Sequence, residues 1–236
     1  MAGGKEKRLR HIGFIMDGNG RWAKQHGKAR SFGHRKGANT IEHVLDACYA
    51  KGVEAVSLYA FSTENWARPK EEVDTIFSLL RSFLKKYSKR LMDKKIRFII
   101  SGDLAMVEDS LREECLKLIE KTKNNKEYTL NIALNYGSRK ELVRAVNLLK
   151  DKQGEITEDD ISSALYTSGL PDIDLVVRTS GEMRLSNFFL WQCAYAEFYF
   201  TDVLWPDFGE KQANEAIEWF YGRNRRLTYR AYCRFA

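Results

Sequence analysis

The sequence predicts a single α/β domain in which a mostly parallel central sheet of about six strands is flanked by helices. Short β-branched and aromatic segments alternate with longer amphipathic segments of helical periodicity. The short segments are nearly all apolar rather than alternating, as expected for parallel strands covered on both faces. Only three prolines occur and no Ser/Gly/Pro-rich linker divides the chain, so we expect one domain over residues 1–236.

Strands are expected at six places, namely 11–16, 55–61, 96–101, 129–135, 173–178 and 198–203. Helical stripes of apolar residues are expected between and after them at 34–50, 71–87, 110–121, 140–149 and 211–221. Residues 1–10 are expected to be flexible. In sheets of this kind ligands bind beyond the carboxyl ends of the strands, so the segments that follow the strands are where a site is expected.

The composition is that of an ordinary globular protein, with 44% hydrophobic and 30% charged residues. The apolar stretches are far shorter than the roughly 20 residues of a membrane-spanning helix, and the start of the chain lacks the pattern of a signal peptide. We therefore expect a cytoplasmic protein. Four widely separated cysteines with no Cys-x-x-Cys pair indicate neither zinc nor disulfides. The net charge of +7 favours an anionic partner without choosing among nucleic acid, a membrane surface and a phosphorylated substrate.

The segment 17–22, which follows the first expected strand, combines two glycines with a carboxylate and an arginine. The glycines let backbone amides approach an anion closely, and the helix that follows would point N–H groups at the same place. Arg21 adds a fork suited to phosphate oxygens. A carboxylate in a phosphate cradle repels the ligand unless a cation lies between them, so Asp17 suggests Mg²⁺. The alternative is a tight strand–helix turn capped by Asp17 or Asn19, and no nucleotide-binding motif is matched.

Two further segments are candidates to complete such a site. Arg30 and His34 lie four residues apart, on one helical face if the helix already runs there, and are suited to a second phosphate. For His34 a purely structural role is the alternative. The segment 61–69 carries uncharged polar groups, a tryptophan and an arginine ahead of a long helix, which is typical of a lid that closes over ligand. The alternative is a solvated loop in which Pro69 begins the helix.

The segment after the fifth expected strand is a second candidate anion site, since Arg178, Arg184 and Ser186 lie within nine residues. Glu197 comes just before the last expected strand, among aromatic residues, where a glutamate is expected to be paired or metal-bound. Together these segments offer two basic phosphate sites and two carboxylates for magnesium, with apolar helices nearby. They predict a soluble, magnesium-dependent enzyme whose substrates carry diphosphate groups and long apolar tails.

Four stretches of the sequence resemble the cis-prenyltransferase family, and within it the bacterial undecaprenyl diphosphate synthases. They are HIGFIMDGNGRWAKQHGKARSFGHRKGA (11–38), LYAFSTENWARPKEEV (58–73), DLVVRTSGEMRLSNFFLWQ (174–192) and AYAEFYFTDVLWPDF (194–208). The resemblance runs in order over nearly the whole chain and is weaker over 85–170. It implies parallel strands flanked by helices with an apolar tunnel, a homodimer, and elongation of farnesyl diphosphate by isopentenyl diphosphate units with new cis double bonds.

The resemblance also implies roles for individual residues. Asp17 is expected to bind the metal and help the allylic diphosphate to leave, and Asn65 matches a residue proposed to assist proton removal. The residues expected to hold or flank the allylic diphosphate are Gly18, Asn19, Gly20, Arg21, Trp22, Arg30 and His34. The lid and substrate-binding residues are expected to be Ser62, Thr63, Glu64, Trp66 and Arg68. Isopentenyl diphosphate is expected at Arg178, Arg184, Leu185 and Ser186, and Glu197 would complete the magnesium site.

The resemblance leaves the length of the product open. We expect undecaprenyl diphosphate, which is a precursor of the lipid carrier for cell-wall glycans. Such a product is insoluble in water, so peripheral contact with the inner membrane surface is expected. Apolar residues of 73–87 and part of 38–48 are candidates for the tunnel wall, with plain core packing as the alternative for each. A non-catalytic partner subunit is a rival interpretation, but Asp17, Arg21, Arg30, Asn65 and Glu197 are all retained, which argues against it. Nucleic-acid binding by the basic run that begins at Arg223 is a second rival, but no base-reading motif accompanies this run, so no nucleic-acid partner is expected. No Asp-Asp-x-x-Asp motif occurs, which excludes a trans-type synthase.

Overall fold

The computed structural model describes residues 8–223. A six-stranded sheet lies at its centre, with the strand order β3-β4-β2-β1-β5-β6 and every neighbouring pair parallel. Most of the basic C-terminal run, and residues 1–7 of the segment expected to be flexible, lie outside the described residues. No helix of the described part is long and apolar enough to cross a membrane.

The strands are close to those expected from the sequence. They are β1 (His11–Ile15), β2 (Ala55–Ser62), β3 (Ile96–Ser101), β4 (Tyr128–Tyr136), β5 (Leu175–Arg178) and β6 (Glu197–Phe200). The largest differences are in the last two, since β5 begins two residues later and β6 ends three residues earlier than expected. In a parallel sheet, alternate residues of one strand face opposite sides. Ile12 and Phe14 accordingly face one apolar core, whereas Ile15 faces the other.

Seven α-helices and three short 3₁₀ helices are found among residues 8–223. The α-helices are α1 (Asn19–Gln25), α2 (Arg30–Ala50), α3 (Lys70–Asp93), α4 (Asp109–Thr122), α5 (Ser138–Leu149), α6 (Glu158–Ala164) and α7 (Glu210–Gly222). The 3₁₀ helices are η1 (Thr63–Ala67), η2 (Leu104–Met106) and η3 (Trp205–Asp207). Sequence periodicity missed α6, which has seven residues and no long apolar stripe; a capping box between Thr157 and Asp160 starts it.

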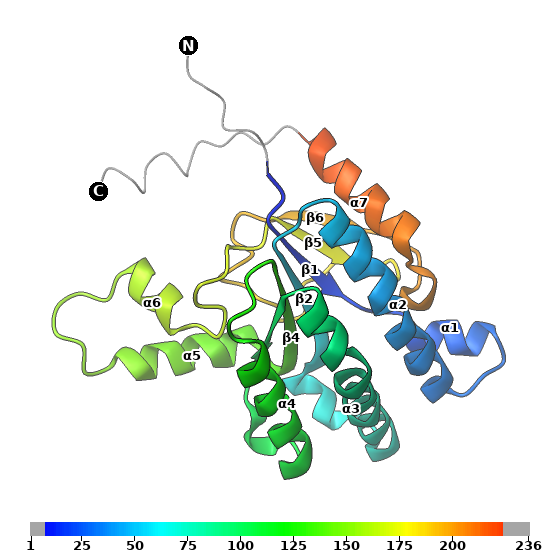
Figure 1. Ribbon diagram of the computed structural model, residues 1–236, viewed down its shortest axis with the longest axis horizontal. Helices are drawn as coiled ribbons and strands as arrows, with labels where there is room; N and C mark the ends of the chain where they lie inside the picture. Colours follow the sequence, from blue (N-terminus) through cyan, green and yellow to red (C-terminus); the bar gives the residue numbers. More distant parts are fainter. Residues whose placement is uncertain (1–7, 224–236) are drawn as a thin grey trace.

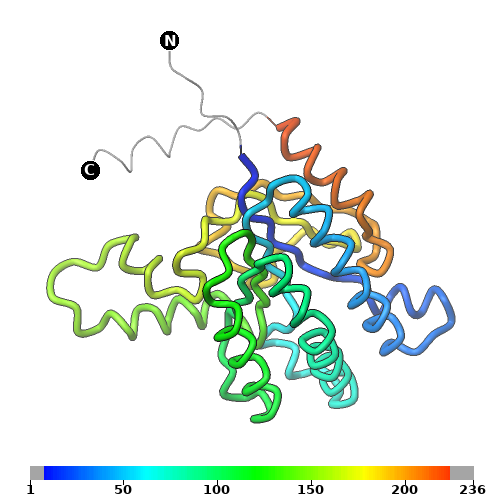
Figure 2. Tube along the Cα trace, in the orientation of Figure 1, coloured from blue at the N-terminus to red at the C-terminus, as the bar shows by residue number. Residues whose placement is uncertain are grey.

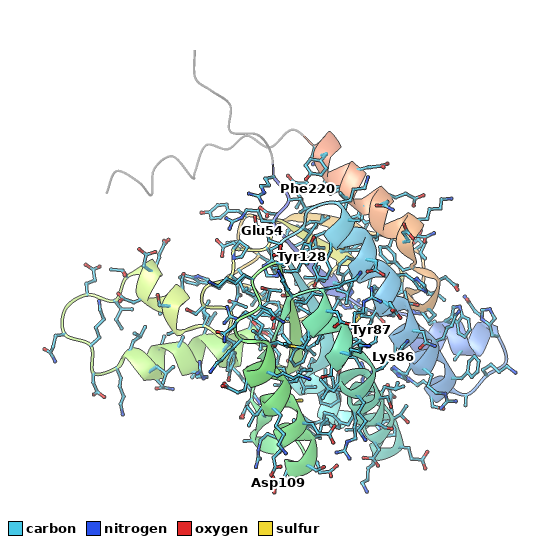
Figure 3. The ribbon with its side chains drawn as sticks, viewed as in Figure 1. Glu54, Lys86, Tyr87, Asp109, Tyr128 and Phe220 are labelled. Atoms are coloured by element: carbon cyan, nitrogen blue, oxygen red, sulfur yellow. The ribbon has the colours of Figure 1, made fainter. Side chains whose placement is uncertain are left out.

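Four helices cover one face of the sheet, and a loop covers part of the other face. Apolar residues of α2, α3, α4 and α7 build the larger core on one face, and these helices lie side by side in Figure 1. Polar groups join α2 to α3, since Lys86 and Tyr87 both reach Glu42 (Figure 3). The smaller core, on the other face, is closed by Phe188 and Phe189 from the loop between β5 and β6.

Close packing of this loop on the sheet requires a glycine in the central strand, because a Cβ at Gly13 would lie 2.8 Å from the ring of Phe188. The helices α5 and α6 pack against each other and lie to one side of the four covering helices (Figure 1). At the opposite side, the chain leaves α1, turns back and enters α2 (Figure 2).

A chain of buried hydrogen bonds crosses four strands of the sheet. The His11 ring bonds the Pro171 carbonyl at Nδ1 (2.8 Å) and the Ser57 hydroxyl at Nε2 (2.7 Å). Asn131 donates to Ser57 Oγ (2.9 Å) and accepts from the Ser101 hydroxyl (3.0 Å). Burial lowers the pKa of His11 to about 4, so its ring is neutral at physiological pH. These bonds satisfy polar side chains inside an otherwise apolar sheet and thereby fix its register.

Candidate active site

A cavity of about 660 Å³ opens at the carboxyl ends of β1, β2, β4 and β5. One end is polar, and the predicted site residues that line it are Asp17, Gly18, Asn19, Gly20, Arg30, His34, Ser62, Glu64, Asn65, Arg68, Arg178, Arg184 and Ser186. The other end is apolar and lies between α2, α3 and the sheet, where Ile41, Ile76, Leu79, Leu80, Phe83 and Leu134 line it. The fold therefore brings most of the residues predicted from separate segments to one place, beside an apolar compartment.

Asp17 directly follows β1, and its carboxylate lies between two arginines. Arg178 Nη2 donates to Asp17 Oδ2 at 3.0 Å, and Arg21 Nη2 lies 3.8 Å from Oδ1. The Thr179 hydroxyl exchanges hydrogen bonds with the backbone N–H and carbonyl of Asp17. The carboxylate is thus held in a fixed position at the mouth of the cavity, where about a third of the side chain is exposed.

The loop after Asp17 is shaped by glycines. Gly18 has a φ of +105°, and a Cβ there would lie 2.9 Å from the Leu204 side chain. On the other side, a Cβ at Gly33 or Gly37 of α2 would lie about 2 Å from oxygen atoms of Asn19. The loop and α2 therefore fit only because glycine stands at both contact positions, a requirement that the sequence pattern does not reveal.

Two residues predicted for the allylic diphosphate and one predicted for the lid surround one buried carboxylate. Glu72, in the first turn of α3, lies 3.1 Å from Arg30 Nε, 3.2 Å from His34 Nε2 and 2.7 Å from Arg68 Nη1. Its side chain is only 7% exposed. Burial lowers the pKa of His34, although Glu72 opposes that effect. The sequence pattern indicates only an apolar stripe over 71–87 and misses Glu72, which gathers cations from α2 and from the lid.

The lid segment is a folded structure in this conformation. The Asn65 side-chain oxygen accepts from the Ser62 N–H (3.1 Å), which caps η1. Trp66 does not line the cavity; its ring packs on Phe61 and Phe77, and its N–H donates to Asn135 Oδ1 (2.8 Å). Trp66 thus anchors the lid to the sheet, while Glu64, Asn65 and Arg68 line the cavity.

The arginines at the end of β5 and in the loop after it are organised by tight backbone turns. Arg178 donates to the Ser186 hydroxyl at 2.8 Å and to the Arg184 carbonyl, and its buried Nε has no hydrogen-bond acceptor among the described residues. Ser186 and its neighbour Asn187 both have positive φ values. Leu185 packs into the smaller core rather than lining the cavity. A buried arginine with a free donor at a cavity wall is suited to an anionic ligand.

Asn187, which the motifs of the sequence did not single out as a site residue, joins this loop to the lid and to α5. Its side chain donates to Glu64 Oε1 (3.1 Å) and accepts from the Arg139 N–H (3.0 Å). Its carbonyl accepts from the Ser138 N–H (2.9 Å). The contact depends on Gly137, where a Cβ would lie 2.8 Å from Asn187 Nδ2.

Besides Trp66 and Leu185, four predicted residues do not line the cavity, and one of them, Arg21, lines a neighbouring cavity. Trp22 is buried, stacks on His26 and donates to Asp207, so it fixes α1 to η3. Thr63 is part of η1 and does not line the cavity. Glu197 is the first residue of β6 and pairs with Leu175, so it lies at the amino end of the sheet. Within one chain, therefore, the structure does not bring Glu197 together with Asp17, which follows the carboxyl end of β1; Glu197 lies 3.5 Å from Arg223.

The donor set at Asp17 is compatible with magnesium. A carboxylate is the kind of oxygen ligand that Mg²⁺ prefers, and this ion keeps several waters and substrate phosphates as its other ligands. Among residues 8–223 no group of three or more His, Cys, Asp and Glu side chains could hold a metal. The protein would therefore supply few ligands to such an ion and the diphosphate would supply others.

The fold and the site define a class of protein: a parallel α/β sheet whose glycine-containing loop and arginines line one cavity that has an apolar extension. The chain belongs to the family described as "Putative undecaprenyl diphosphate synthase", whose model matches residues 15–228.

Two relatives and two solved structures illustrate this membership. An isoprenyl transferase of Fusobacterium nucleatum is 55% identical, over 92% of this chain and 95% of the relative. A ditrans,polycis-undecaprenyl-diphosphate synthase, (2E,6E)-farnesyl-diphosphate specific, of Vibrio vulnificus is 45% identical over 92% and 90%. A probable undecaprenyl diphosphate synthase from Campylobacter jejuni has a TM-score of 0.79 at 35% identity, covering 93% and 98%. Lavandulyl diphosphate synthase from Lavandula x intermedia, in complex with dimethylallyl diphosphate, has a TM-score of 0.88 at 31% identity, covering 92% and 96%.

Proposed function

We propose that this chain is a cis-prenyltransferase that adds successive isopentenyl diphosphate units to farnesyl diphosphate and releases undecaprenyl diphosphate. The observation that carries the proposal is the single cavity, with cations at one end and apolar side chains at the other. A diphosphate with a long hydrocarbon tail has the same two parts in the same order. The names of the relatives support this substrate and this product.

In each cycle the allylic C–O bond breaks and inorganic diphosphate leaves, while the isopentenyl double bond forms the new C–C bond and one proton is lost. Arg30, His34 and Arg68 exchange Glu72 for the allylic diphosphate and hold it as negative charge develops. Mg²⁺ held by Asp17 would supply additional positive charge for the departing diphosphate. Arg178 keeps the Asp17 carboxylate oriented throughout.

Isopentenyl diphosphate binds at Arg178, Arg184 and Ser186, which puts its double bond near the allylic carbon. The proton passes to a diphosphate oxygen, because the Asn65 amide is no strong base and its oxygen already accepts from the Ser62 N–H. Asn65 then acts by capping the lid segment rather than by taking the proton.

The apolar end of the cavity takes the growing chain. Ile41 of α2 and Ile76, Leu79, Leu80 and Phe83 of α3 face it. Removing apolar surface from water contributes roughly 25 cal/mol per Å², so each added isoprene unit favours deeper insertion until the compartment is full. The eleven-unit length of the product is proposed from the names of the relatives.

Three further parts of the proposal rest on the family resemblance. The chain acts as a homodimer, with exposed apolar residues such as Val143 and Val146 of α5 available for contact. It is cytoplasmic and touches the inner membrane surface to deliver its insoluble product. That product serves as the precursor of the lipid carrier for cell-wall glycans.

The proposal is tested by incubating the purified protein with farnesyl diphosphate and radiolabelled isopentenyl diphosphate, with Mg²⁺ or with a chelator. We expect a Mg²⁺-dependent ladder of products that ends near eleven isoprene units. A shorter end point would keep the reaction and refute the assigned product. No elongation by a folded protein would refute the reaction and favour a non-catalytic partner subunit.

A further inference from the structure

A second, basic cavity of about 530 Å³ adjoins the first at the glycine loop. The two share Asp17, Gly18, Gly20 and Arg30, so the glycine loop and Arg30 border both. The basic cavity is completed by Arg21 and by two lysines, Lys24 on α1 and Lys28 in the turn before α2. Several of its lining residues belong to the segment in which α1 turns back to α2, which lies at the edge of the fold in Figure 2, and all four of its basic side chains belong to exposed residues.

Of the four basic side chains of this cavity, the two arginines form ion pairs and, among the described residues, the two lysines do not. Arg21 donates to Ser180 and lies 3.1 Å from Glu182, while Arg30 is bound to Glu72. Within residues 8–223, by contrast, neither Lys24 nor Lys28 has an ion-pair partner. The lysines therefore add two positive charges outside these ion pairs, beside a loop that already favours anions. Asp17 borders the same cavity, and Lys28 Nζ lies 5.9 Å from the centre of the Phe32 ring.

The backbone around the lysines is fixed. The N–H groups of Gly27 and Lys28 donate to the carbonyls of Lys24 and Ala23, which closes the end of α1. Gly27 has a φ of +62°, and nothing lies within 4 Å of a Cβ built there. The turn thus returns the chain tightly and places Lys28 on the same cavity as Lys24.

We propose that this basic cavity binds inorganic diphosphate after each condensation and releases it to solvent. The inference rests on the proposed function, in which a diphosphate leaves the allylic position in every cycle. After condensation the prenyl chain fills the apolar compartment. Arg178 and Arg184 hold the diphosphate of the lengthened product, so the inorganic diphosphate cannot leave through either of these two regions. The basic cavity borders the glycine loop on the side of α1, where its basic residues are exposed to solvent. A lysine ammonium is a strongly hydrated point charge, so we expect it to release a bound phosphate group to water easily.

The test is a titration of the whole protein with magnesium diphosphate, compared with inorganic phosphate. We expect the double variant Lys24→Ala/Lys28→Ala to bind diphosphate roughly tenfold or more weakly, since two charge-assisted contacts are lost. The matched control is Lys85→Ala/Lys89→Ala, which removes two exposed lysines, also four residues apart, from α3. It should bind diphosphate like the wild type. Unchanged affinity in the first variant, equal weakening in the control, or equal affinity of the wild type for phosphate would overturn the proposal.

A second arm separates inorganic diphosphate from the diphosphate head of the substrate. The affinity for farnesyl thiolodiphosphate, which does not react, should change less than twofold in the Lys24/Lys28 variant, whereas product inhibition by inorganic diphosphate should weaken in parallel with its binding. Equal losses for both ligands would assign the lysines to the substrate and overturn the release site. The titration measures binding and needs no turnover. It therefore shows whether the basic cavity binds diphosphate even if the elongation assay finds no reaction, and the two proposals can fail separately.

Discussion

Glu72 is the residue on which two of the predicted phosphate-binding side chains and an arginine of the predicted lid converge. A buried carboxylate among cations balances their mutual repulsion, and it holds Arg30, His34 and Arg68 in the places where a diphosphate would replace it. Its partners are partly exposed, so the electrostatic gain is smaller than that of a fully buried pair. The pattern of the sequence could not reveal this role, because Glu72 looks like any acidic residue in a first helical turn.

We predict that Glu72→Ala raises KM for farnesyl diphosphate about tenfold and lowers the free energy of unfolding by about 1–2 kcal/mol, because Arg30, Arg68 and the His34 ring lose the acceptor that positions them. Steady-state kinetics and urea unfolding measure the two effects. Glu71→Ala is the control, since Glu71 is exposed and adjacent. Kinetics and stability indistinguishable from those of this control would contradict the role given to Glu72.

At the scale of elements, Asn187 connects the lid to the loop that carries Arg184 and Ser186. Its amide holds Glu64 of η1 on one side and the first turn of α5 on the other. Such a link couples the position of the lid to the conformation of the loop that we propose binds isopentenyl diphosphate. No pattern in the sequence indicates this link, because the positive φ of Asn187 and the close approach of Gly137 arise only in the folded chain.

Asn187→Ala should therefore raise KM for isopentenyl diphosphate several-fold more than KM for farnesyl diphosphate. The physical reason is that Ser186 and the lid both lose a common anchor, whereas Arg30, His34 and Glu72 lie on α2 and α3, away from the hydrogen bonds that Asn187 makes to η1 and α5. Initial rates with each substrate varied in turn give the comparison, and Asn124→Ala, an exposed amide in the turn after α4, is the control. Equal increases in both KM values would show a general loss of structure instead.

At the scale of the whole molecule, the parallel sheet explains which predictions succeeded. Apolar runs locate the strands, and parallel strands bring their carboxyl ends together, so the sequence alone predicts that Asp17, Ser62 and Arg178 share a site. Glu197 shows the limit of this reasoning. It comes just before the expected strand 198–203, so the strand pattern itself places it at the amino end of the sheet, and β6 does the same. Its magnesium role is expected from the family resemblance, and within one chain the parallel sheet keeps it apart from Asp17.

The buried hydrogen-bond chain across the sheet predicts a pH dependence of stability. The folded-state pKa of His11 is about 4, below the ordinary 6.5, so between these values the unfolded chain binds more protons. Stability is therefore fully retained above pH 6.5 and falls as the pH drops toward 4, by about 3 kcal/mol from this group.

Urea unfolding at pH 7 and pH 4.5 measures this effect. His11→Asn should be less stable at pH 7 and should lose less stability than the wild type on acidification, whereas His43→Asn, at an exposed position, should follow the wild type. The same loss in the wild type and in His11→Asn would assign the pH dependence to other groups.

Asp17, at the mouth of the cavity, is the residue on which the proposed Mg²⁺-dependent elongation depends most. The most direct measurement is the rate of isopentenyl incorporation by Asp17→Ala in the presence of Mg²⁺, beside Asp93→Ala, which removes an exposed carboxylate at the end of α3. We predict a loss of roughly a hundredfold to a thousandfold for Asp17→Ala, in the range found when a group that stabilises developing charge is removed, and none for Asp93→Ala. Elongation by a folded Asp17→Ala at a rate close to that of the wild type would contradict the role given to Asp17.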